Sequence, residues 1–332
     1  MAIERVGVVG GGAWGTALGV VVRANGHDVT LWAREAAVVE AINAEHRNPL
    51  FLPEVELDPG LRATAEMAEA AQAEVLLLVT PAQHLRAVAG ELAPHLPDGV
   101  PLVICAKGLE RESCALMSEV LAEVLPEAPL AVLSGPTFAI EVARGLPTAV
   151  TLAATDRALG ARLVELIGSP TFRPYLGADL IGAQVGGAVK NVLAIACGIV
   201  EGRRFGENAR AALTTRGLAE LLRLGAAKGA RAETLMGLSG LGDLVLTCNS
   251  ELSRNTSLGI ALGQGATLDE VLAARHSVAE GVATAPAVTL LAHKLGVEMP
   301  ISLAVDGIVN HHASIDATIE GLLARPFTTE SG

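Results

Sequence analysis

Short apolar runs alternate with longer amphipathic segments through the first half of the chain. The runs are rich in Val, Leu and Ile and are bounded by turn residues, which is typical of buried strands. We predict strands over Arg5–Val9, Val29–Trp32, Val75–Val79, Leu102–Ala106 and Leu130–Leu133, with Thr148–Ala153 and Phe172–Tyr175 as further strands at an edge. We predict helices between them over Trp14–Asn25, Ala36–Ala44, Gln83–Leu92 and Cys114–Val124. This alternation favours βαβ units and a parallel sheet with helices on both faces.

The strand pattern fades after Asp179. From Ile181 onward the chain is rich in Ala, Leu and Gly, and its apolar positions recur with a helical period. We therefore expect an α/β protein with a parallel-sheet domain over residues 1–180 and an all-α domain over residues 181–332. The boundary rests on the change of period alone, because no repeat or low-complexity linker marks it.

Composition narrows the class of protein. The 332 residues exceed the size at which one hydrophobic core stops growing, and 51% hydrophobic residues against 18% charged ones exclude a disordered chain. The net charge of −12 opposes binding to nucleic acid or an anionic membrane. Mean hydropathy is +0.45, yet apolar runs such as Val192–Val200 fall short of the roughly 20 residues that a membrane span needs. We expect no nucleic-acid partner and no membrane span.

The cysteines and histidines form no recognisable disulfide or metal pattern. Cys105, Cys114, Cys197 and Cys248 are widely scattered and include no C-x-x-C pair, a usage that fits a reducing cytoplasm. His311 and His312 are adjacent, so their side chains would diverge on a helix. We expect no metal cofactor.

A glycine motif follows the first predicted strand. Gly10, Gly12 and Gly15 match G-x-G-x-x-G between a strand and a helix, the context in which such glycines bind a dinucleotide pyrophosphate. The first domain is therefore expected to be of the Rossmann type. The alternative is a glycine-rich turn without a ligand.

The end of the second predicted strand bears on which cofactor would bind. Arg34 could pair with a 2′-phosphate, whereas Glu35 could accept a hydrogen bond from a 2′-hydroxyl. The sequence favours NADP, with NAD as the other possibility. Alternatively, Arg34 is an ordinary solvated arginine at a helix start.

Several polar segments lie where ligands bind in open sheets, where a buried charge needs a partner, or where a helix starts. Lys107 follows the fourth strand, and Ser134–Ala139 follows the fifth and opens a helix. Lys190 lies in an apolar helix, where desolvation would lower its pKa, and Asp243 is the partner that we expect for it. Ser253–Asn255 forms a predicted helix start suited to a phosphate. The alternatives are surface lysines, helix caps and loops.

Taken together, these segments resemble bacterial NAD(P)-dependent sn-glycerol-3-phosphate dehydrogenases. The matching blocks are Gly10–Leu18, Ala106–Glu110, Ser134–Ala139, Gly186–Asn191, Thr215–Leu218, Gly240–Cys248, Ser253–Asn255 and Glu280–Gly281. Only the glycine motif is generic, and the other blocks are specific in combination. The resemblance implies reversible NAD(P)H-dependent reduction of dihydroxyacetone phosphate to sn-glycerol 3-phosphate for glycerophospholipid synthesis.

The resemblance also implies roles for particular residues. Lys190 would be the catalytic acid and base, assisted by Lys107 and Asp243. The triose phosphate would be bound by Lys107, Gly135, Thr137, Lys190, Asp243, Ser253, Arg254 and Asn255. The cofactor would be bound by Gly10, Gly12, Ala13, Trp14, Gly15, Arg34, Lys107, Ala139, Arg254, Val278 and Glu280. Ala13 departs from the family, which often has Ser there, so one hydroxyl contact to the pyrophosphate would be missing.

Two other functions remain open at this point. A β-hydroxyacid dehydrogenase or ketopantoate reductase would share the two domains and the lysine but act on a carboxylate substrate. A catalytically silent NAD(P) sensor would share the glycine motif without needing the lysine, aspartate and arginine. Apolar helices in the second half suggest a homodimer.

Overall fold

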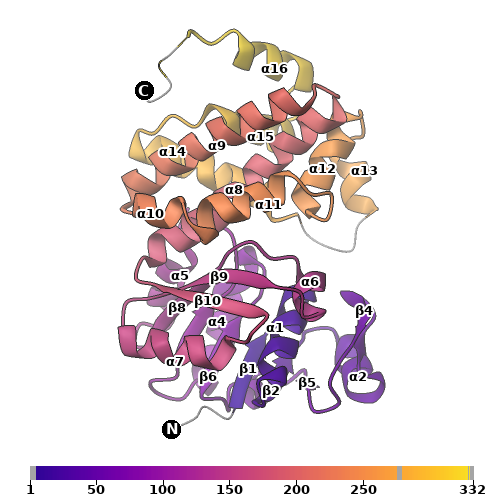
Figure 1. Cartoon of the computed structure of the whole chain (residues 1–332), viewed down its shortest axis with the longest axis vertical. Coiled ribbons are helices and arrows are strands. Elements are labelled where there is room, and N and C mark those ends of the chain that lie inside the picture. Colours follow the sequence, from indigo (N-terminus) through magenta and orange to yellow (C-terminus); the bar gives the residue numbers. More distant parts are fainter. Residues whose placement is uncertain (1–4, 275–278, 328, 330–332) are drawn as a thin grey trace.

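The computed structural model describes residues 5–274, 279–327 and 329. Figure 1 shows a sheet with its helices in the lower half of the molecule and a bundle of helices above it. The chain passes from the sheet to the bundle between strand β10 (Phe172–Gly177) and helix α8 (Leu180–Gly202).

The sheet has eight strands in the order β10-β9-β8-β7-β6-β1-β2-β5. The remaining strands of this sheet are β1 (Arg5–Val9), β2 (Asp28–Trp32), β5 (Arg62–Thr64), β6 (Val75–Leu78), β7 (Leu102–Ile104), β8 (Leu130–Ser134) and β9 (Thr148–Ala154). β1 pairs in parallel with β2 on one side and with β6 on the other. Strand order therefore reverses at β1, and in open sheets of this kind ligands bind beyond the carboxyl ends of the strands at such a reversal. Each strand predicted from an apolar run is present, and β10 lies at an edge.

One strand pair departs from the predicted parallel arrangement. β8 and β9 run antiparallel, whereas β10 is parallel to β9. The connection from β8 to β9 contains only the five-residue helix α6 (Ala139–Ala143). A parallel crossover needs a longer connection, so the chain turns back beside β8 instead. The sheet is Rossmann-like, with β9 and β10 reversed relative to the other strands.

Helices cover both faces of the sheet. They are α1 (Ala13–Ala24), α2 (Ala36–Glu45), α3 (Met67–Ala70), α4 (Leu85–Leu92), α5 (Met117–Val124) and α7 (Arg157–Ile167), with 3₁₀ turns η1 (Ala82–His84) and η2 (Ala93–His95). The prediction that the fourth helix begins at Cys114 was wrong, because Cys114 has a left-handed φ of 62°. A small hairpin of β3 (Arg47–Asn48) and β4 (Leu52–Glu56) was not predicted.

Among the described residues after β10, every regular element is a helix, as expected. These elements are α8, α9 (Glu207–Lys228), α10 (Ala232–Leu235), the π-helix η3 (Leu238–Gly242), α11 (Asp243–Cys248), α12 (Arg254–Gly263), α13 (Leu268–Ala273), α14 (Glu280–Leu295), α15 (Pro300–His311) and α16 (Ile315–Leu323). Figure 1 shows α8 inside this bundle, surrounded by the other helices.

α8 is the core helix of the bundle. Within the described ranges it is the one helix long and apolar enough to cross a membrane by length and composition, but 89% of its apolar window is buried inside the protein. It packs very closely on α12, since a Cβ on Gly198 would lie 2.2 Å from the Thr256 carbonyl oxygen. A Cβ on Gly259 would likewise lie 2.1 Å from the Ile195 carbonyl oxygen. The glycines of the second half therefore let two backbones touch, which holds the start of α12 against α8.

Candidate active site

The glycine motif forms the turn between β1 and α1. Gly10 has a φ of 130°, which a residue with a side chain rarely adopts, and a Cβ on Gly15 would lie 1.9 Å from the Gly10 carbonyl oxygen. A Cβ on Gly12 would meet nothing within 4 Å. Gly12 is the N-cap of α1 and has no side chain to cap the helix. The first N–H groups of α1 can therefore receive an anion, and these residues fit the pyrophosphate of a dinucleotide.

The predicted cofactor residues around this turn differ in what they contact. Arg34 follows β2, and its guanidinium lies 3.1 Å from the Glu35 carboxylate with the side chain 75% exposed. Trp14 instead packs on Phe172 of β10, with ring centroids 6.5 Å apart. Ala13 is half-buried against the core of the sheet domain. The Arg34 side chain is thus largely exposed at the end of β2, whereas Trp14 contributes to packing.

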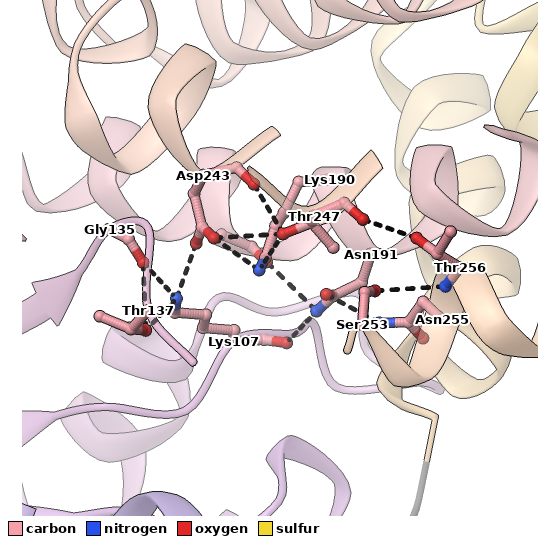
Figure 2. Close-up of polar contacts among 11 residues, drawn as sticks. Lys107, Gly135, Thr137, Lys190, Asn191, Asp243, Thr247, Ser253, Asn255 and Thr256 are labelled. Carbon is pink, nitrogen blue, oxygen red and sulfur yellow. Dashed lines mark hydrogen bonds and ion pairs between the residues drawn. The ribbon is translucent and has the colours of Figure 1, made fainter. Parts of the chain in front are cut away.

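Two lysines meet one aspartate where the sheet and the bundle join (Figure 2). Lys190 Nζ donates to Asp243 Oδ1 at 2.7 Å, which confirms the expected ion pair. Lys107 Nζ donates to the other carboxylate oxygen, Asp243 Oδ2, at 2.6 Å. Lys107 also donates to the Gly135 carbonyl oxygen at 2.7 Å and lies 3.4 Å from Thr137 Oγ1. The side chain of Asp243 is fully buried, so one carboxylate is shared by two cations.

Burial sets the protonation chemistry of Lys190. Desolvation lowers the pKa of Lys190 to about 8, because the charged ammonium loses its water. The Asp243 carboxylate opposes this effect, and the charge of Lys107 adds to it. The sequence-based expectation of a lowered pKa is confirmed. An amine with this pKa can both give and take a proton near neutral pH.

Local backbone geometry places Asp243 beside α8. The π-helix η3 directly precedes Asp243, and such wide turns often occur at functional sites. A Cβ on Gly186 of α8 would lie 2.3 Å from the Ser239 carbonyl oxygen in η3. The next residue, Gly187, faces the other domain, where a Cβ would lie 2.9 Å from Ser134 Oγ and 3.3 Å from Lys107 Cγ. Two adjacent glycines therefore let both halves of the cluster approach α8.

Thr247 belongs to the cluster and was missed by the sequence reasoning. Lys190 Nζ donates to Thr247 Oγ1 at 2.8 Å, and that hydroxyl donates to the Asp243 carbonyl oxygen at 2.6 Å. The spacing of four residues puts Asp243 and Thr247 on one face of α11. That spacing was the available signal. Thr247 orients the ammonium together with the carboxylate.

A chain of amides links the cluster to the start of α12. Asn191 Nδ2 donates to the Lys107 carbonyl oxygen at 3.1 Å, and Asn255 Nδ2 donates to Asn191 Oδ1 at 2.9 Å. Asn255 Oδ1 in turn accepts from the Gly281 N–H at 3.0 Å. Figure 2 shows these residues running from Lys107 toward α12. The chain holds the predicted phosphate-binding segment in register with the lysine cluster.

The start of α12 has the predicted helix-start geometry. Ser253 is its N-cap and accepts from the Thr256 N–H through its hydroxyl at 3.2 Å. Arg254 is exposed at the first position of α12; partial desolvation lowers its pKa, and the charge of Glu280 acts in the opposite direction. Burial raises the pKa of Glu280 to about 7. Its Oε2 is buried and, among the described residues, has no hydrogen-bond partner. An exposed guanidinium and a partly buried carboxyl beside a helix start form a polar lining suited to an organic phosphate or a cofactor.

Two further residues, Ala139 and Val278, were predicted to contact the cofactor. Ala139 is the first residue of α6 and packs half-buried on the core of the sheet domain. Val278 lies outside the described residues. Within the described parts of the chain, no group of three or more His, Cys, Asp or Glu side chains could hold a metal ion.

Sequence comparison gives matches over both halves. The model of the "NAD-dependent glycerol-3-phosphate dehydrogenase N-terminus" matches residues 5–160, and that of the corresponding C-terminus matches residues 179–320. The glycerol-3-phosphate dehydrogenase [NAD(P)+] of Parvibaculum lavamentivorans is 60% identical over 100% of this chain and 99% of its own length. The protein of the same name from Rhodospirillum rubrum is 61% identical over 99% of this chain and 95% of its own length.

Structure comparison agrees. The crystal structure of glycerol-3-phosphate dehydrogenase from Coxiella burnetii superposes with a TM-score of 0.94 at 38% identity, covering 97% of this chain and 99% of that one. The similarity therefore extends over the sheet, the bundle and the site between them. This chain belongs to the NAD-dependent glycerol-3-phosphate dehydrogenase family.

Proposed function

We propose that this chain catalyses the reversible, NAD(P)H-dependent reduction of dihydroxyacetone phosphate to sn-glycerol 3-phosphate, which supplies glycerophospholipid synthesis. Membership of the family supports the reaction. The observation that carries the proposal is the buried Lys190 ammonium held by Asp243, with Lys107 on the same carboxylate. A carbonyl reductase needs a proton donor of this kind where the alkoxide forms.

The sheet domain would hold the cofactor. The turn at Gly10, Gly12 and Gly15, with Ala13 and Trp14 between the last two glycines, would receive the pyrophosphate. Arg34 would bind the 2′-phosphate of NADP. Lys107, Ala139, Arg254, Val278 and Glu280 would complete the cofactor site. When bound, the reduced nicotinamide supplies the hydride. We propose NADPH as the preferred reductant because an exposed guanidinium lies at the end of β2.

Lys190 would donate or accept the proton that the reaction transfers. In the reduction, the Lys190 ammonium donates a proton to the C2 carbonyl oxygen of dihydroxyacetone phosphate as negative charge builds there. Asp243 and Thr247 keep the ammonium oriented, and Lys107 adds positive potential. In the oxidation, the neutral Lys190 amine takes the proton from the C2 hydroxyl of sn-glycerol 3-phosphate. A pKa of about 8 makes both forms accessible near neutral pH.

The start of α12 would hold the phosphate of the triose. Ser253 caps the helix, and the Asn255 side chain is engaged by Asn191 and Gly281. The phosphate would therefore be met by the Arg254 guanidinium and by backbone N–H groups of the first turn. Gly135 and Thr137, already in contact with Lys107, would face the triose from the sheet side.

Three broader expectations accompany this function. Residues 1–180 would form the dinucleotide domain and residues 181–332 the substrate domain, a division supported by the change from strands to helices after β10. The four cysteines are all free and buried, which supports a cytoplasmic location. A homodimer stays a prediction that sedimentation would test.

A substrate and cofactor panel tests the function. Dihydroxyacetone phosphate, ketopantoate and a hydroxyisobutyrate semialdehyde would each be offered with NADPH and with NADH, and oxidation of the cofactor followed by absorbance. We expect turnover of dihydroxyacetone phosphate alone, with Lys190→Met lowering kcat by about 10²–10⁴. Reduction of ketopantoate without reduction of dihydroxyacetone phosphate would overturn the assignment. Cofactor binding without any turnover would indicate a sensor.

A further inference from the structure

Asn48 lies in the β3–β4 hairpin, far along the chain from the glycine turn, yet it contacts that turn directly. Its side chain is completely buried. Its amide nitrogen donates to the Gly11 carbonyl oxygen at 2.9 Å and to Thr16 Oγ1 at 2.8 Å. Its amide oxygen accepts from the Phe51 N–H at 3.1 Å. A buried amide with these partners bridges the hairpin to both ends of the turn.

The contact with Gly11 determines how the turn presents its N–H groups. A trans peptide unit is planar, so the Gly11 carbonyl and the Gly12 N–H point in opposite directions. Because Asn48 holds the carbonyl on its own side, the Gly12 N–H is directed to the other side. Glycine itself provides no steric restraint on this peptide plane. The orientation of the N–H therefore depends on the hydrogen bond from Asn48.

The hairpin that carries Asn48 is itself anchored. Glu54 of β4 forms an ion pair with Arg144, the residue that ends α6. The Leu57 N–H donates to the His46 carbonyl oxygen at 2.8 Å and closes the base of the hairpin. Leu52 and Val55 are buried in the core of the sheet domain. These contacts fix the hairpin, so the Asn48 side chain has a fixed position against the glycine turn.

We propose that Asn48 is a positioning residue for the cofactor: by holding the Gly11 carbonyl and the Thr16 hydroxyl, it fixes the glycine turn in the conformation that receives a dinucleotide pyrophosphate. The inference rests on the proposed function for the identity of the ligand. It assigns to the unpredicted hairpin a part in cofactor affinity, with no contact to the reacting atoms.

Asn48→Asp tests the proposal, with Asn25→Asp as the matched control. The aspartate keeps the shape and the acceptor for Phe51 but replaces the donor with an oxygen facing the Gly11 carbonyl. Asn25 ends the same helix α1 at its other end, and its amide donates to the carbonyl oxygens of Leu166 and Gly168. Each variant removes an amide N–H donor that contacts two acceptors, but only Asn48→Asp removes it at the glycine turn.

Three measurements are made on each folded variant. The Kd of NADPH and of NADH is measured by fluorescence titration, the KM of dihydroxyacetone phosphate and kcat by initial rates, and the exchange of the Gly12 amide hydrogen in the ligand-free protein by mass spectrometry. For Asn48→Asp we expect about a tenfold rise in both cofactor Kd values and faster exchange, since the hydrogen bond that holds the Gly11 carbonyl is lost. The KM of dihydroxyacetone phosphate and kcat at saturating cofactor should stay within about twofold of the parent.

A pH series separates positioning from a general loss of stability. A neutral aspartic acid regains one O–H donor, so the Kd ratio between Asn48→Asp and the parent should shrink as the pH falls. Asn25→Asp should lower the melting temperature without changing either Kd. Equal Kd values for Asn48→Asp and the parent, or equal effects of both variants, would overturn the proposal.

A further variant covers failure to fold. If Asn48→Asp does not fold, Thr16→Val removes one of the two acceptors while keeping the shape, and a Kd within twofold of the parent would then count against the proposal. Failure of the proposed function is distinguishable, because the Kd and exchange measurements need no turnover. A parent that binds NADPH but does not reduce dihydroxyacetone phosphate would refute the function and leave the role of Asn48 decided by Kd.

Discussion

Replacing Asp243 by Asn would remove the one carboxylate that both active-site lysines share. At 2.7 Å and an effective dielectric constant of about 20, the attraction between Lys190 and Asp243 is about 6 kcal/mol. With a pKa of about 8, Lys190 loses its proton at pH 7 at a cost of only about 1.4 kcal/mol. The lost attraction exceeds this cost, so in Asp243→Asn Lys190 should be neutral at pH 7.

The consequence is a change in the pH dependence of the rate. In the parent, kcat for reduction of dihydroxyacetone phosphate should fall as the pH rises through about 8, because the reaction needs the Lys190 ammonium. In Asp243→Asn this fall should occur below pH 7. The kcat of the variant at pH 7 should therefore be at most about one hundredth of the parental kcat. Initial rates between pH 5.5 and 9, at saturating cofactor and substrate, measure both curves.

Glu220→Gln is the control for burying an amide in place of a carboxylate. Glu220 is buried and accepts from the Ile301 and Ser302 N–H groups at the start of α15. Among the described residues, its hydrogen bonds go to these two residues and to neither active-site lysine. Its loss should lower the free energy of unfolding and leave the pH profile of kcat unchanged. If Asp243→Asn kept the parental midpoint near pH 8, or kept kcat within about threefold, the shared carboxylate would not control the proton donor.

Two further variants test single charges. The pKa of Lys190 is about 8 in the folded protein, below its ordinary value of 10.5. Between these two pH values unfolding takes up a proton, so the folded state becomes more stable as the pH rises. The free energy of unfolding of the parent should therefore increase by about 3 kcal/mol relative to that of Lys190→Met between pH 8 and pH 10.5. Urea unfolding at several pH values measures this gain, and parallel curves would contradict it. Arg34→Ala should raise the Kd of NADPH about tenfold or more and that of NADH by less than about twofold. Equal losses in a fluorescence titration would show that Arg34 does not contact the 2′-phosphate.

Several features were predictable from the chain because they depend on local pattern. The apolar runs indicated β1, β2, β6, β7 and β8, since a strand buried on both faces of a sheet must be apolar along its length. The glycine turn was predictable because a positive φ at Gly10 and the close approach of Gly15 need residues without a side chain. An isolated lysine in an apolar helix predicted a buried counter-ion, and Asp243 is that counter-ion.

Other features depended on which elements pack together. The reversal of β9 follows from the short connection through α6, and no pattern within β9 indicates its direction. The β3–β4 hairpin is too short and too polar to produce a strand signal, yet it delivers Asn48 to the glycine turn. Thr247 shared only its four-residue spacing with Asp243 as a hint.

The sequence by itself therefore determined the strand-rich first half, the helical second half, the glycine turn and the ion pair of Lys190 with Asp243. Only the tertiary structure decided that Lys107 shares the same carboxylate and that the Asn191–Asn255 amides join the cluster to α12. The physical reason is the separation along the sequence between the residues that interact. Hydrophobic period and backbone conformation depend on neighbours a few residues away, whereas a shared carboxylate requires α8, α11 and the end of β7 to meet. That meeting depends on contacts such as those at Gly186 and Gly187, which no single segment specifies.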